Sequence, residues 1–188
     1  MENRKHFSRI LAPTIFLSFL IAIPMLGHAQ ESKNIESYNL GLSNLSQEKY
    51  KDALDAFLKV KNNRTMKGNP TEYQLQMALA RSYLGLKQYG EAWKNLEAAL
   101  KENSGSSEVY LFRGIYYFEQ EKFRDAKVEL DKAISLNKDE AYAYYYEGMA
   151  HYHLGEPAEA VEDLKTFVGL KPDAPEADKA AALIKKLC

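Results

Sequence analysis

Few side chains in this 188-residue chain are placed for acid–base or metal chemistry. Beyond residue 29 there are two histidines, His151 and His153, and a spacing of two directs them to different sides of a helix. Glu147 and His151 share a helix face and form half of a metal site, but no further ligand cluster accompanies them. There is also no glycine-rich phosphate loop, nucleophile elbow or cysteine–histidine arrangement. We therefore expect no enzyme activity, no cofactor and no metal.

The elements that carry these residues repeat along the chain. A small residue is followed 12 positions later by an alanine, and four positions after that by an apolar residue, in four places. The small pairs are Gly41 and Ala53, Ala80 and Ala92, Gly114 and Ala126, and Gly148 and Ala160. Small residues let two helices approach closely, and one helical pair cannot bury its apolar side alone. The sequence therefore predicts stacked helix pairs.

This pattern resembles the tetratricopeptide repeat, a 34-residue helix–turn–helix unit. The resemblance implies an all-α fold, a short right-handed α-solenoid. The repeats would span residues 34–67, 73–106, 107–140 and 141–174, followed by a capping helix at about 174–187. Tyr110 and Tyr144 fit the aromatic that is common early in the first helix, whereas Ser37 and Gln76 depart from it.

The same register places the individual helices. In the first repeat we expect helices at Ile35–Ser46 and Lys51–Lys61, with Leu40, Gly41, Ala53 and Phe57 facing inward. The later helices are predicted at Tyr73–Gly85, Tyr89–Lys101, Glu108–Gln120, Phe123–Leu136, Ala141–Leu154 and Ala158–Leu170.

Capping signals mark three of the helix ends. Asn69 is predicted to cap the helix of the second repeat, with Pro70 at its first position. Gly155 ends the first helix of the fourth repeat. Asp173 with Glu176 resembles a capping box for the final helix. Residues 62–70 hold the five extra residues of the first repeat, which we interpret as a surface insertion. Within it, Asn63-Arg64-Thr65 also fits a glycosylation acceptor.

The N-terminal segment, residues 1–29, has the composition of a secretory signal peptide. A basic start with Arg4, Lys5 and Arg9 precedes a largely apolar run from Ile10 to Leu26. Small residues then predict cleavage after Ala29, which leaves a domain of residues 30–188. The run is short and interrupted by prolines, so we expect no stable membrane span once it is removed. The expected location is outside the cytoplasm, periplasmic or secreted; the alternative is an uncleaved anchor.

Charge and cysteine content limit the possible functions of the predicted mature chain. Cleavage would leave 22 basic and 25 acidic residues, a formal charge of −3. Nucleic-acid binders carry a basic stripe, so we expect no nucleic-acid partner. The single cysteine, Cys188, is the last residue and excludes an internal disulfide. An exposed, incidental thiol is the favoured interpretation, and a bridge between two chains is the alternative.

Arg113 and Glu147 are polar residues at a repeat position that is normally apolar, and they lie one repeat length apart. Equivalent positions on neighbouring first helices should face each other across the stack. We predict a partly buried Arg113–Glu147 ion pair with His151 nearby, which would fix the register between repeats. The alternative is that both side chains extend past the apolar surface to water.

By resemblance, the functional surface is the inner curve of the solenoid, where partner peptides lie in this family. Carried over by register, the predicted groove residues are mostly apolar or aromatic. They are Tyr38, Leu42, Met77, Arg81, Leu84, Leu111, Ile115, Phe118, Tyr142, Tyr145, Met149 and Tyr152. Only Arg81 offers the positive charge with which some relatives hold a terminal carboxylate. A groove rich in tyrosine suits a hydrophobic or aromatic peptide or helix. The alternative is that some of these side chains complete the core, and for any single residue of the set a place in the core is favoured over contact with a partner.

Two functions follow from these expectations. The first is an exported scaffold or adaptor that binds a protein or peptide partner in the concave groove, in envelope assembly or secretion. The alternative is a self-associating structural subunit, a homo-oligomer in which the groove or the capping helix packs on another copy. The partner, the pathway and the oligomeric state do not follow from the sequence.

Overall fold

The structure is a computed structural model that describes residues 14–63 and 70–188. Within these ranges the chain forms nine helices and no strand, which confirms the all-α prediction. In order, the helices are α1 (Thr14–Ser46), α2 (Tyr50–Asn62), α3 (Glu72–Gly85), α4 (Tyr89–Glu102), α5 (Ser107–Phe118), α6 (Phe123–Leu136), α7 (Ala141–Leu154), α8 (Pro157–Leu170) and α9 (Ala177–Leu187).

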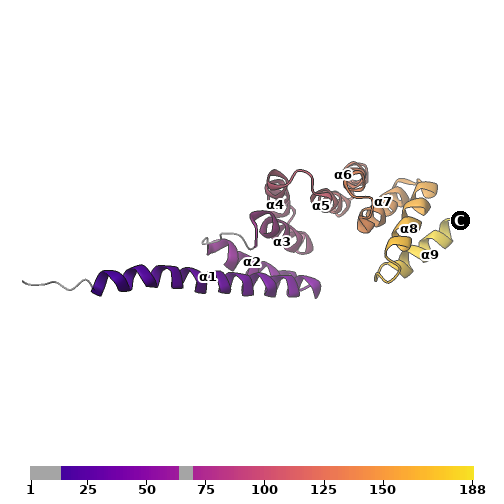
Figure 1. Ribbon diagram of the computed structural model, residues 1–188. Coiled ribbons are helices and arrows are strands. Elements are labelled where there is room, and N and C mark those ends of the chain that lie inside the picture. The colour runs from indigo at the N-terminus through magenta and orange to yellow at the C-terminus, as the bar shows by residue number, and fades with distance from the viewer. Residues whose placement is uncertain (1–13, 64–69) are drawn as a thin grey trace, which may run out of the picture.

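The helices pack in consecutive pairs that stack along one direction (Figure 1). We call α1, α3, α5 and α7 the first helices, and α2, α4, α6 and α8 the second helices. Each first helix packs most extensively against the second helix that follows it. The N-terminal part of α1 extends beyond α2 (Figure 1). This arrangement is an α-solenoid, as the repeat pattern predicts.

Small residues lie where the two helices of a pair cross, as predicted. Ala53, Ala92, Ala126 and Ala160 have no exposed surface. A Cβ atom placed on Gly114 would lie 2.5 Å from Cγ of Leu130, and one on Gly148 would lie 2.9 Å from Cγ of Leu164. Since a larger side chain would have to push the second helix away, these positions set the spacing within each pair.

The first helix of the chain differs most from its prediction. The helix predicted at Ile35–Ser46 is the C-terminal part of α1, which begins at Thr14. Leu40 is 55% exposed, so the prediction that it faces inward is wrong, although Gly41, Ala53 and Phe57 are buried as expected. Residues 35–46 turn only one side toward α2 and α3, and Leu40 lies outside that side. Arg4, Lys5 and Arg9 lie outside the described residues.

Two capping predictions are also wrong. The α3 helix begins two residues beyond Pro70, with Thr71 as its N-cap instead of Asn69. The Thr71 side chain accepts a hydrogen bond from the backbone N–H of Gln74, and the Gln74 side chain accepts one from the backbone N–H of Thr71. Thr71 and Gln74 therefore form both hydrogen bonds of a capping box. Similarly, α9 begins at Ala177, after the predicted start, and no side chain caps it. Residues 64–69, with most of the predicted insertion and two residues of the glycosylation triplet, lie outside the described ranges.

The turn between first and second helix has the same shape in every pair. One residue with positive φ follows each first helix: Glu48 (57°), Lys87 (57°), Glu121 (60°) and Gly155 (77°). Only the fourth repeat places a glycine there, where left-handed backbone favours it. The predicted end of α7 at Gly155 is confirmed.

Hydrogen bonds join the beginnings of successive repeats. The Tyr73 hydroxyl lies 2.6 Å from Ser106 Oγ and donates to Glu108 Oε2 at 3.1 Å. Ser107 donates to Glu140 at 3.1 Å, and Tyr142 donates to Glu176 at 3.2 Å. Burial, the main cause, raises the pKa of Tyr73 to about 12, so its hydroxyl stays protonated as a donor. These bonds fix each repeat relative to the next.

The last helix covers the end of the stack. Ala180 is buried, and Leu183 and Ile184 pack against the apolar cluster of α7 and α8 that contains Phe167. Lys179 and Lys185 are exposed on the other side of α9. None of the helices in the described part of the chain is long and apolar enough to span a membrane.

The crossing at Gly148 makes a direct prediction about stability. We expect Gly148→Ala to lower the free energy of unfolding by about 1–3 kcal/mol, because the added methyl group meets Leu164 and the Ala160 carbonyl oxygen at 3.1 Å. The control is Gly169→Ala in α8, where nothing lies within 4 Å of the added carbon; it should raise stability by roughly 0.5–1 kcal/mol. Urea unfolding measures both. An equal increase in the free energy of unfolding in the two variants would contradict close packing at the crossing.

Candidate functional site

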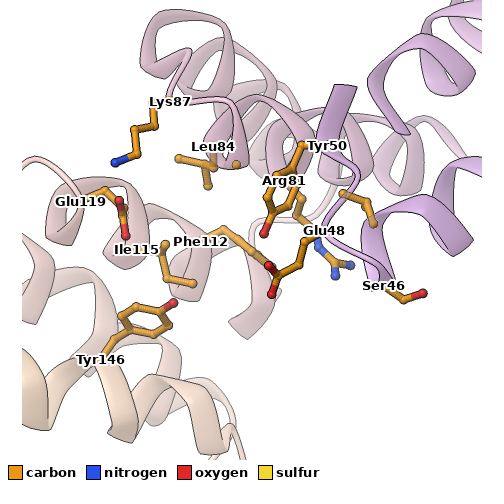
Figure 2. Close-up of a pocket in the computed structure, with 12 residues that line it drawn as sticks. Ser46, Glu48, Tyr50, Arg81, Leu84, Lys87, Phe112, Ile115, Glu119 and Tyr146 are labelled. Carbon is orange, nitrogen blue, oxygen red and sulfur yellow. The ribbon is translucent and has the colours of Figure 1, made fainter. Parts of the chain in front are cut away.

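A pocket of about 430 Å³ opens between the first helices of the solenoid (Figure 2). Residues from α1, α2, α3, α5 and α7 and from the turns that follow α1, α3 and α5 line it, so every repeat contributes. The lining residues are Leu45, Ser46, Glu48, Tyr50, Arg81, Leu84, Gly85, Lys87, Phe112, Ile115, Glu119 and Tyr146. We call this pocket the groove pocket.

Aromatic and aliphatic side chains form much of the wall of the groove pocket. Phe112 and Ile115 come from one face of α5, and Tyr146 approaches from α7 (Figure 2). The guanidinium of Arg81 lies 5.3 Å from the centre of the Phe112 ring, which holds both side chains in place. Burial, together with the nearby charge of Glu119, raises the pKa of Tyr146, so its hydroxyl is a neutral hydrogen-bonding group.

Charges of both signs stand at the edges of the groove pocket. Figure 2 places Lys87 and Glu119 at one end and Glu48 near Arg81 at the other. Within the described residues, no ion pair involves any of these four side chains. Unpaired charges at the edge of an apolar wall remain available to a ligand that carries the opposite charge.

The structure brings together only part of the predicted groove. Arg81, Leu84 and Ile115 line the groove pocket. Met77, Leu111 and Tyr145 are 3%, 5% and 7% exposed and belong to the apolar clusters between helices. The other predicted residues lie elsewhere on the first helices. Leu42 is exposed, and the side chains of Tyr38, Tyr142 and Met149 are half-buried against apolar clusters. Phe118 packs against Phe123 and Tyr146, and Tyr152 lies beneath the ammonium group of Lys186.

Sequence reasoning missed several residues of the groove pocket. Phe112 and Tyr146 occupy equivalent positions in successive repeats, so the pair of bulky residues at one repeat position was the available signal. Glu48 and Lys87 lie in the turns, whose left-handed residues bring charged side chains to the pocket edge. Tyr50 lies on α2, a second helix, whereas the groove positions carried over from the resemblance all lie on first helices.

A second polar arrangement lies between the second helices, and it corrects the predicted Arg113–Glu147 pair. Arg113 instead binds two carboxylates, Glu97 Oε1 on α4 at 2.9 Å and Glu129 Oε1 on α6 at 2.8 Å. Its guanidinium also lies 4.6 Å from the centre of the Trp93 ring. The predicted pair is wrong because each first helix directs this position between its two flanking second helices, and not along the stack toward the next first helix.

Glu147 occupies the corresponding place one repeat later, between carboxylates. It is 5% exposed on α7 and shares a hydrogen bond with Asp131 of α6. Burial, that hydrogen bond and the charges of Asp131 and Asp163 raise the pKa of Glu147 to about 9, against the opposing charge of Lys127. Burial also raises the pKa of Asp163 to about 6, while the charge of His151 opposes the shift. Glu147 is therefore protonated at neutral pH and donates to Asp131.

His151 lies near this group but is engaged on its other side. Its Nδ1 atom is 2.6 Å from Glu156 Oε2, and Lys127 Nζ is 3.0 Å from the same oxygen. Its Nε2 atom is 3.6 Å from Asp163 Oδ2. In the described part of the chain, no group of three or more histidine, cysteine, aspartate or glutamate side chains is arranged to hold a metal ion. His153 stacks on Phe123 at 4.5 Å instead.

Comparison with known proteins agrees with this geometry. A family model described as tetratricopeptide repeat matches residues 112–185, and a second with the same description matches residues 77–121. Human tetratricopeptide repeat protein 13 is 30% identical over 95 residues, which are 50% of this chain and 11% of that protein. The chain thus spans about a tenth of the length of this relative.

Two solved structures resemble the fold. TTC0263, a thermophilic tetratricopeptide-repeat protein of Thermus thermophilus, superposes with a TM-score of 0.66 at 22% identity over 82% of this chain and 80% of that one. The first tetratricopeptide-repeat domain of Spaghetti (RPAP3), bound to the HSP90 peptide SRMEEVD, has a TM-score of 0.57 at 22% identity over 62% and 92%. The chain therefore contains tetratricopeptide repeats.

The Arg113 arrangement predicts a non-additive response to substitution. Arg113→Met should lower the free energy of unfolding by about 3 kcal/mol, because Glu129, whose side chain is 14% exposed, loses its counter-charge. Adding Glu129→Leu should recover most of that loss, since an apolar pair needs no counter-charge. Glu97, at 41% exposed, is solvated without a partner. A double variant as unstable as Arg113→Met would contradict this account.

The raised pKa of Glu147 predicts how stability depends on pH. Between about pH 4.5 and 9 the folded protein keeps a proton on Glu147 that the unfolded chain has lost, so stability should fall as pH rises through this window. Glu147→Gln should remove that slope and raise the melting temperature more at pH 8.5 than at pH 5. Glu102→Gln, exposed on α4, is the control and should behave as wild type. Parallel pH profiles for wild type and Glu147→Gln would contradict the assignment.

Proposed function

We propose that this protein is an exported interaction scaffold that binds a segment of a partner protein in the groove pocket. The observation that carries the proposal is the pocket itself: it is about 430 Å³, open, and built from elements of every repeat. Aromatic walls supply contact area with little loss of side-chain freedom, and binding of this kind is dominated by a few buried anchors. The bound segment would place one large apolar or aromatic side chain against Phe112, Ile115 and Tyr146.

The charges at the pocket edge add a second requirement. Lys87 and Arg81 suit acidic groups on the ligand, and Glu48 and Glu119 suit basic ones. Because both ends of the pocket carry a residue of each sign, the favoured ligand has an apolar anchor flanked by charged residues of both signs. The similar domain that was solved with an HSP90 peptide supports a peptide as the class of ligand.

Export is the second part of the proposal. It is supported by the sequence of residues 1–29, a basic start and an apolar run that ends in small residues. The predicted cleavage after Ala29 falls inside α1, which runs from Thr14 to Ser46. Cleavage there would leave residues 30–46, the part of α1 that packs on α2 and α3. N-terminal mass spectrometry of the protein from its native source tests this, with Gln30 expected as the first residue.

The binding proposal predicts a peptide preference that substitution can remove. Short linear peptides displayed on phage and selected on the purified protein should share a large aromatic or aliphatic residue. Ile115→Glu should raise their Kd by at least about tenfold, because it places a charge in the pocket wall. Lys87→Glu should raise the Kd of peptides in which acidic residues flank the apolar one.

The matched control is Lys101→Glu, an exposed residue of α4 outside the pocket, which should leave the Kd unchanged. Circular dichroism checks that each variant folds. Selected peptides that bind Ile115→Glu as tightly as wild type would contradict the proposal. Light scattering of the purified protein tests the alternative function: a stable oligomer in which no peptide reaches the pocket would favour self-association.

A further inference from the structure

The helix pairs do not pack on one another equally. We call the contact between one pair and the next a junction, and name it by the second helix and the first helix that meet there. Of the junctions between the four pairs, α6–α7 has the most extensive packing and α4–α5 the least, and α3 also packs less on α5 than α5 does on α7. Each repeat of a solenoid is held only by its neighbours, so the stack bends most easily where a junction is weakest.

The start of α5 is anchored at the α4–α5 junction. The Tyr73 hydroxyl of α3 lies 2.6 Å from Ser106 Oγ and donates to Glu108 Oε2 at 3.1 Å. Val109 has no exposed surface and belongs to an apolar cluster with residues of α3 and α4. The beginnings of α3 and α5 are therefore held together, next to the linker of residues 103–106, most of which is exposed.

At the opposite end, the other two junctions are filled by rings. An aromatic residue at the start of the second helix lies there against the end of the next first helix. At α2–α3 this residue is Tyr50, whose ring leaves no space for a Cβ atom on Gly85. At α6–α7 it is Phe123, whose ring stacks on that of His153 at 4.5 Å, and Phe118 lies 5.9 Å from the same histidine ring. Ring packing therefore closes this end of both junctions.

The same end of the α4–α5 junction is filled less completely. The residues that correspond to Phe123, His153 and Phe118 are Tyr89, Glu119 and Leu84. The Tyr89 hydroxyl donates to the backbone oxygen of Glu119 at 3.5 Å, and the Tyr89 ring lies 6.0 Å from that of Tyr116. Because Glu119 is exposed and Leu84 is smaller than a phenylalanine, two of the three rings have no equivalent here.

The groove pocket spans this less filled end of the α4–α5 junction (Figure 2). Arg81 and Leu84 line the pocket from one side of the junction, and Ile115 and Tyr146 line it from the other. Since the two walls belong to different sides of the junction, the angle between α3 and α5 sets the width of the pocket.

We propose that the solenoid bends at the α4–α5 junction, about the anchored start of α5, and that the groove pocket closes on its ligand by this bend. A ligand that contacts both walls binds the closed conformation more tightly and shifts the population toward it. This is hinge closure, in which a few residues at the ends of elements take up the motion. The closure rests on the proposed function, whereas the bend is a property of the free protein.

The test is double electron–electron resonance between nitroxide labels in a Cys188→Ser background. Lys94, Val128 and Glu162 are exposed and occupy the same position of α4, α6 and α8. Lys94→Cys/Val128→Cys spans the α4–α5 junction, and Val128→Cys/Glu162→Cys spans the α6–α7 junction as the matched control. In the free protein we expect a broader distance distribution for the first pair. Equal widths for the two pairs would overturn the proposal.

A second variant tests the cause of the bend. Leu84→Phe/Glu119→His copies the ring contacts of the α6–α7 junction into the α4–α5 junction. It should narrow the Lys94–Val128 distribution to the width of the control pair, and Glu119→His alone, at an exposed position, should narrow it in part. Circular dichroism checks that each variant folds. An unchanged width in both variants would also overturn the proposal.

A peptide selected for the groove pocket tests the closure. Its binding should lengthen the mean Lys94–Val128 distance and narrow the distribution, because closing the pocket side of the junction opens the side that carries the second helices. The Val128–Glu162 distribution should stay the same. A peptide that binds and leaves both distributions unchanged would overturn the closure. If no peptide binds the groove pocket, the proposed function fails, and the widths in the free protein still decide whether the junction bends.

Discussion

The close approach of two helices at a glycine or an alanine is the constraint on which this structure depends. Where Gly148 meets α8, there is no space for an added methyl group, so the distance between the helices is fixed by contact. Once the two helices of a pair have this spacing, they cover only part of each other's apolar surface. The next helix pair must cover the remainder. The stack, its curvature and its end cap follow from that requirement.

The two sides of the first helices then acquire different chemistry. One side carries the groove pocket, where Phe112, Ile115 and Tyr146 form an aromatic and aliphatic wall. The other side meets the second helices, where a single position holds Arg113 in one repeat and Glu147 in the next. The fold tolerates both because flanking carboxylates pair with the arginine and share a proton with the glutamate. Variation at one repeat position therefore replaces an ion pair with a hydrogen-bonded pair of carboxyl groups.

Much of the fold could be predicted because it depends on local spacing. The helix predicted at Phe123–Leu136 has those bounds, and that at Ala141–Leu154 likewise, since small residues, turn residues and apolar positions all agree there. Where local signals compete, the prediction was wrong: Asn69 is a good cap, but Thr71 with Gln74 satisfies both ends of a capping box. Leu40 illustrates a different limit, because an apolar residue on a terminal helix has no neighbour on its outer side.

The candidate site was harder to predict because it depends on how repeats tilt against one another. Register alone places Met77, Leu111 and Tyr145 on the inner curve, yet packing between repeats buries them. Register also suggests that residues at the same repeat position of neighbouring first helices contact each other. Arg113 and Glu147 are instead each directed between two second helices. A sequence pattern gives the face of a helix but not the angle between successive pairs, and that angle decides which side chains remain accessible.

Native-state hydrogen exchange tests the central claim most directly, because it measures the opening free energy of each helix separately. If the small-residue crossings hold the stack, amides beside Gly114 and Gly148 should exchange only through global unfolding, with the free energy that denaturant unfolding gives. Amides of α9 should open at lower free energy, since that helix packs mainly on α8 and no further helix pair covers its other side among the described residues. An opening free energy beside Gly114 and Gly148 that is as low as the one in α9 would contradict the account.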